Sequence, residues 1–92
     1  MLTEFEVRQR VREIRSSSIA PMRKARMLLR LGRSLNNQFR MLAHARAQVS
    51  RAADRNASAI LSRMVQRTQL LHEDVREQAL RALKDRPRAD LN

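Results

Sequence analysis

Arginine is the residue type with the clearest chemical potential in this chain. It accounts for eighteen of the twenty basic residues. A guanidinium group is a planar fork of donors that can bind a phosphate or a carboxylate through two parallel hydrogen bonds. Arg23, Arg26, Arg30 and Arg33 follow one another at spacings that place them on one face of a helix. This row predicts a surface that binds a negatively charged partner.

The distribution of charge supports the same prediction. The net charge is +11, and between Glu13 and Glu73 the only acid is Asp54, against eleven arginines and one lysine. A face of mixed sign would be an ordinary solvated surface, whereas a surface without acids favours an anionic partner. The predicted nucleic-acid or anionic-partner binding residues are Arg23, Lys24, Arg26, Arg30, Arg33, Arg40, Arg51 and Arg55.

Three kinds of partner fit such a surface: nucleic acid or another polyanion, an acidic protein, or an anionic membrane surface. The remaining interpretation is a solvated surface without a partner. We expect nucleic acid, contacted at its phosphate backbone by a small subunit of a larger assembly. The alternative is a protein–protein adaptor or regulator that docks an acidic protein. Neither Phe5 nor Phe39 falls in the arginine row, so base stacking is not expected.

A helix-turn-helix would use the segment from residue 37 as its recognition helix. Asn37, Gln38 and Arg40 would stand at its start, and these residue types can read base edges. The preceding turn, however, lacks the usual glycine, and the expected helix lengths fit this motif poorly. The sequence therefore disfavours base-specific recognition of this kind.

The sequence lacks the residues that most kinds of active site require. A single glycine leaves no phosphate-cradling loop, and the absence of cysteine removes disulfides and thiolate metal sites. His44 and His72 have no carboxylate three or four residues away that could be a second metal ligand on the same helix face. Glu77 precedes Arg81 by four residues, which favours a solvated ion pair over acid–base catalysis. We therefore expect a protein that is not an enzyme and that uses no metal or cofactor.

The chain length of 92 residues predicts one helical domain over residues 1–86, followed by a short tail over 87–92. The longest charge-free runs are seven residues, far below the roughly 20 that a membrane crossing needs. With charged residues filling the first fifteen positions, no secretion signal is expected, and the interpretation is a soluble cytoplasmic protein. A chain this short buries a modest core, so a homodimer is one way for it to gain stability.

Capping signals divide the first half of the chain. Thr3 and Glu6 match a capping box, which predicts a helix that starts at Thr3. The serines at 16–18 predict a break, and Pro21 suits the first turn of a second helix. Asparagines at 36 and 37 favour turns, so the segment 34–37 is the next expected break.

Two further helices are expected after that turn, over residues 37–53 and 57–85, with Pro87 ending the second. Their apolar faces are about 80° apart on a common helical wheel, which favours a break near Asp54–Asn56 over one continuous helix. Asp54, Asn56 and Ser58 are the candidate caps at this break. The fold class is thus all-α, as an antiparallel helical hairpin or a three- to four-helix bundle.

The expected core follows from the same periodicity. The residues predicted to point inward are Ala25, Leu28, Leu29, Leu31, Gly32 and Leu35; Phe39, Leu42, Ala45, Val49, Ala52 and Ala53; and Ile60, Leu61, Met64, Val65, Leu71, Val75, Ala79 and Leu83.

Overall fold

Three helices make up the protein in the computed structural model, which describes residues 1–52 and 54–84. Helix α1 spans Glu4–Ser16, α2 spans Pro21–Arg51 and α3 spans Arg55–Lys84. The described residues contain no strand, so the all-α prediction is confirmed. The expected helix end at Pro87, the tail over 87–92 and the inward position of Ala53 lie outside the described residues.

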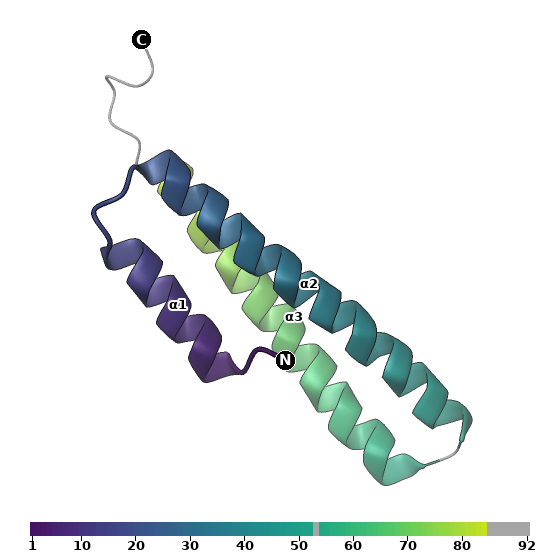
Figure 1. Ribbon diagram of the computed structural model, residues 1–92. Coiled ribbons are helices and arrows are strands. Elements are labelled where there is room, and N and C mark those ends of the chain that lie inside the picture. Colours follow the sequence, from purple (N-terminus) through teal and green to yellow (C-terminus); the bar gives the residue numbers. More distant parts are fainter. Residues whose placement is uncertain (53, 85–92) are drawn as a thin grey trace.

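Helices α2 and α3 form a long antiparallel hairpin (Figure 1). The buried positions follow steps of three, four or seven residues: Ala25, Leu28, Gly32, Leu35 and Leu42 on α2, and Val65, Thr68, Leu71, Val75 and Ala79 on α3. This is the heptad repeat of two helices that cross at a small angle and interlock their side chains. Together with α1 this hairpin makes a rod of 58 × 23 × 14 Å.

The hairpin reverses where the sequence predicted a break. Helix α2 ends at Arg51 and α3 begins at Arg55. The Asp54 carboxylate accepts a hydrogen bond from the Ala57 backbone N–H at 3.1 Å, and the Asp54 carbonyl accepts from the Ser58 N–H at 3.0 Å. Asp54 is therefore the N-cap of α3, and the alternative of one continuous helix through this region is wrong.

The turn predicted at residues 34–37 is wrong, because α2 runs through it. Inside the helix the Ser34 hydroxyl donates to the Arg30 carbonyl at 3.3 Å, a bond that lets serine stay helical. Leu35 and Leu42, on either side of the asparagines, are both buried. Core packing on both sides thus outweighs the local turn preference of asparagine. Since α2 has no turn here, the segment from residue 37 is not the second helix of a helix-turn-helix motif.

Helix α1 begins as predicted at the Thr3 cap. The Glu6 backbone N–H donates to the Thr3 hydroxyl oxygen at 3.2 Å. The return half of the capping box differs, because the Glu6 carboxylate accepts from the Thr3 hydroxyl at 3.3 Å instead of from the backbone. Leu2 and Val7, either side of this cap, both pack into the core.

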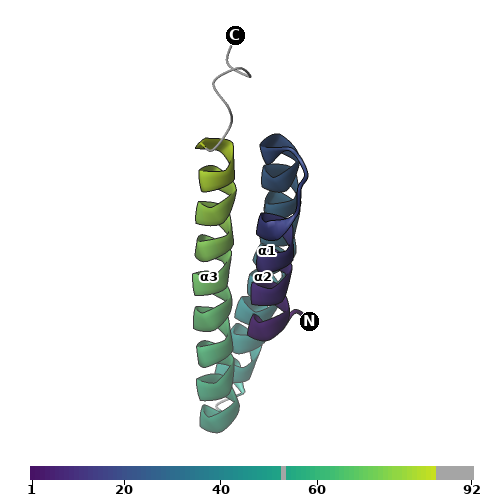
Figure 2. The same cartoon turned by 90° about the vertical axis from the view of Figure 1, so that its left-hand side faces the viewer.

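Helix α1 lies along one half of the hairpin only (Figures 1 and 2). Its buried Val7 joins the core, with Val11 and Ile14 packed against it. Gln38 holds one end of this helix, since its side chain accepts from the Leu2 N–H at 2.8 Å and donates to the Leu2 carbonyl at 3.1 Å. The other end lies near the start of α2, so the half of the hairpin beyond Gln38 has no third helix over it.

Three residues predicted to point inward are exposed: Leu29, Ala52 and Ile60. Leu29 and Ile60 flank the heptad core on opposite sides of the hairpin, where only a third helix could bury them, and α1 covers neither position. Arg46 is a polar residue at a core position of the heptad. The heptad places it toward α3, but its side chain remains exposed. The other described residues of the predicted core are buried or half-buried.

None of the described helices combines the length and the apolar character that a membrane crossing requires.

Candidate nucleic-acid interface

Six arginines line the outward face of α2. Since α2 is one continuous helix, Arg40 and Arg51 fall on the same face as the four-arginine row predicted from sequence. All six lie in the outermost heptad positions, opposite the buried residues, and all are exposed. We call this surface the arginine stripe; its members are Arg23, Arg26, Arg30, Arg33, Arg40 and Arg51.

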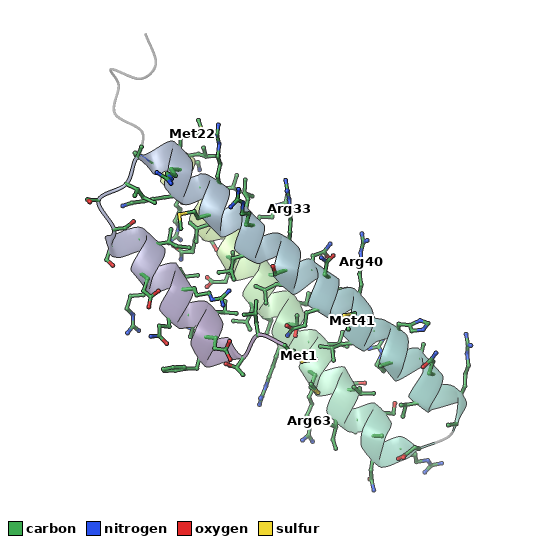
Figure 3. All side chains as sticks on the ribbon, viewed as in Figure 1. Met1, Met22, Arg33, Arg40, Met41 and Arg63 are labelled. Atoms are coloured by element: carbon green, nitrogen blue, oxygen red, sulfur yellow. The ribbon has the colours of Figure 1, made fainter. Side chains whose placement is uncertain are left out.

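The arginine stripe is long and straight. At a rise of about 1.5 Å per residue, Arg23 and Arg51 are roughly 42 Å apart along the helix axis. Arg33 and Arg40 extend from the same side of α2, whereas Arg63 of α3 points in another direction (Figure 3). The stripe thus occupies one side of the rod and is held in line by the packing of α2 on α3.

Two of the predicted site residues lie off the stripe. The half-buried Lys24 is on the side of α2 that faces α1, and its Nζ donates to the Arg15 carbonyl at 2.9 Å. That bond satisfies a carbonyl at the end of α1, so Lys24 serves the fold. Arg55 is the first residue of α3, at the hairpin turn, close in sequence to the stripe's last member.

None of the carboxylates that the structure describes pairs with the arginine stripe. Over residues 1–52 and 54–84 the ion pairs are Arg8–Glu4 at 2.9 Å and Arg81–Glu77 at 2.7 Å, and both are exposed pairs within one helix. Asp54, the only acid in the middle of the chain, uses its carboxylate to cap α3. The guanidinium groups of the stripe are therefore exposed, of one sign and not paired with any described carboxylate, as a surface for an external anion requires.

The candidate metal and acid–base residues do not come together. Among the described residues, no three histidine or carboxylate side chains are grouped closely enough to hold a metal ion. His44 pairs with Gln48 at 3.1 Å, whereas His72 lies next to Gly32, about a dozen residues away along α2. Glu77 forms the expected ion pair with Arg81.

Sequence reasoning missed two exposed arginines of α3. Arg63 points away from the stripe (Figure 3), and Arg67 lines a pocket with Glu4 and Arg8 of α1. The 3.5-residue repeat of α3, counted from Val65 and Thr68, was the signal that could have placed them.

Comparison with known proteins gives no relative: no protein-family model, curated protein or solved structure matches this chain.

Proposed function

We propose that this protein is a non-enzymatic binding subunit that contacts the phosphate backbone of nucleic acid through the arginine stripe. The observation that carries the proposal is the alignment of six exposed arginines on one face of a 31-residue helix, none of them in an ion pair with a residue of 1–52 or 54–84. Such a surface needs an anion to offset its self-repulsion. A polyanion with regularly spaced charges fits a straight row of guanidinium groups.

The chemistry of the stripe favours sequence-independent binding. Arginine forks on phosphate fix the position of a protein on a duplex and carry no base information. Phe5 lies on α1 and Phe39 is half-buried, so the stripe has no aromatic ring on which a base could stack. Gln38, a base-reading candidate in the helix-turn-helix alternative, uses its side chain to bind the Leu2 backbone.

The salt dependence of duplex binding tests the proposal. Each phosphate neutralised contributes about −0.9 to the slope of log affinity against log salt, so four to seven phosphates give a slope of about −4 to −6. The double variant Arg26→Gln/Arg30→Gln should bind every duplex more weakly and flatten the slope by about 2. Both side chains are exposed, so the fold should persist.

The matched control is Arg8→Gln/Arg81→Gln, which removes the same charge from the two arginines already in ion pairs. If duplex binding depends on the position of the arginines in the stripe, and not only on net charge, this control should keep most of the wild-type salt slope. Absence of duplex and single-strand binding at micromolar protein and near-physiological salt would contradict the proposal. Stoichiometric capture of an acidic protein, lost in the Arg26/Arg30 variant, would assign the stripe to the adaptor function instead.

A further inference from the structure

The uncovered half of the hairpin carries apolar side chains on the side where α1 packs. Pockets at the start of α1 connect Met1 and Leu2 with Gln38 and Met41 of α2 and with Met64 of α3. Beyond them, toward the hairpin turn, the same side of the heptad holds Ala45 and Val49 on α2 and Ile60 on α3. We call this surface the open groove; its members are Met41, Ala45, Val49, Ile60 and Met64.

Two large apolar side chains of the open groove are exposed. Met41 is 70% exposed and Ile60 is 57% exposed, whereas Ala45, Val49 and Met64 are half-buried. Met1, which is 74% exposed, stands at the end of the groove where α1 begins (Figure 3). Clustered exposed apolar side chains at heptad-flanking positions are typical of a surface that another helix covers.

Helix α1 shows what kind of element fits on this side of the hairpin. It is 13 residues long and places Val7, Val11 and Ile14 over the covered half. The open half, residues 39–51 of α2 and 55–67 of α3, is also 13 residues long on each helix, about 20 Å at the helical rise. A second helix of the same length would lie end to end with α1 and complete the three-helix layer.

The open half is basic. Residues 39–67 hold six arginines, and their one acid, Asp54, uses its carboxylate to cap α3. Arg67, at the end of this half, lines a pocket together with Glu4 of α1. A helix seated on the open half therefore needs acidic flanks.

We propose that the open groove binds an acidic amphipathic helix of a partner protein, about 13 residues long, with apolar residues at i, i+4 and i+7. A second copy of this chain fits less well because it would bring another +11 charges to a basic surface. This inference is separate from the proposed function. Met64 of the open groove shares a pocket with Arg67, whereas Arg33 and Arg40 of the arginine stripe point in another direction from Arg63 of α3 (Figure 3).

The test is an NMR titration of the whole protein with a blocked 13-residue peptide. The peptide keeps Val7, Val11 and Ile14 of α1 at their spacing, with alanine at most other positions and glutamate at five outward ones. A control peptide carries lysine at those five. We expect saturable shifts of the Met41, Ile60 and Met64 methyl signals with the acidic peptide only, and a monomeric protein by light scattering.

Variants separate this groove from the stripe. Ile60→Lys keeps the positive field but removes the apolar contact, so it should weaken peptide binding at least tenfold, and Met41→Lys should do the same from α2. Leu80→Lys, an exposed leucine on another face, should bind as wild type. Arg26→Gln/Arg30→Gln should lose duplex affinity while keeping peptide affinity within about twofold.

Three results would overturn the proposal: no methyl shifts at millimolar acidic peptide, equal binding of the lysine peptide, or equal loss in Ile60→Lys and Leu80→Lys. A dimer that Ile60→Lys dissociates would instead assign the groove to a second copy.

Discussion

At the scale of single residues, Thr3 tests how α1 starts. Its hydroxyl accepts the Glu6 N–H, one of the four N–H groups that the first turn of a helix leaves unpaired. Thr3→Ala should lower the free energy of unfolding by about 1 kcal/mol, within the usual range for an N-cap. Thr3→Ser retains the oxygen and should stay near wild type in chemical denaturation. Equal loss in both variants would assign the effect to the threonine methyl group.

Leu28 and Leu29 are neighbours with opposite environments. Leu28 is 0% exposed and Leu29 is 44% exposed, although the periodicity predicted both to point inward. Leu28→Asp should unfold the protein because it buries an unpaired carboxylate, whereas Leu29→Asp should cost little. Circular dichroism of the two variants checks this pair. A folded Leu28→Asp protein would mean that the α2–α3 interface is wrong.

At the scale of elements, the sequence predicted the boundaries that carry a local capping signal. Thr3, Pro21 and Asp54 each satisfy or tolerate unpaired backbone groups at a helix start, and all three starts are observed to within a residue or two. The turn predicted at 34–37 was wrong because it was based only on the local preference of asparagine for turns. The heptad through Leu28, Leu35 and Leu42, which continues unbroken, is the stronger determinant.

The continuity of α2 has a direct test by insertion. One alanine added after Asn37 rotates everything downstream by about 100°, so Leu42 would leave the core while Leu28 stays in it. We expect severe loss of thermal stability. One alanine added after Ala52, where α2 has ended, should be tolerated because the connection to α3 can lengthen at little cost. Similar melting curves for the two insertions would contradict a continuous helix.

At the scale of the whole molecule, the candidate site was predictable only in part. The arginine row follows from spacing alone. Its extension to Arg40 and Arg51 requires an unbroken α2, and the position of Lys24 beside α1 requires knowing where α1 docks. Docking of a short helix depends on long-range contacts such as Gln38 with Leu2, which no local pattern encodes. The open groove was hidden for the same reason.

The charge of the whole molecule predicts how salt acts on its stability. With a net charge of +11 and two exposed ion pairs among the described residues, repulsion outweighs attraction in the folded rod. Screening at higher ionic strength should therefore raise the melting temperature, measured by circular dichroism at 222 nm between 20 mM and 500 mM NaCl. Duplex affinity should fall over the same range.

The Arg26→Gln/Arg30→Gln variant sharpens this forecast. It removes two of the repelling charges from α2, so its melting temperature at low salt should exceed that of wild type, and the difference should shrink as salt rises. Phosphate should stabilise the wild type more than chloride at equal ionic strength, because an anion that binds the folded stripe adds to screening. A melting temperature that falls with added salt would mean that attractive pairs dominate, and it would remove the electrostatic reason for an anionic partner.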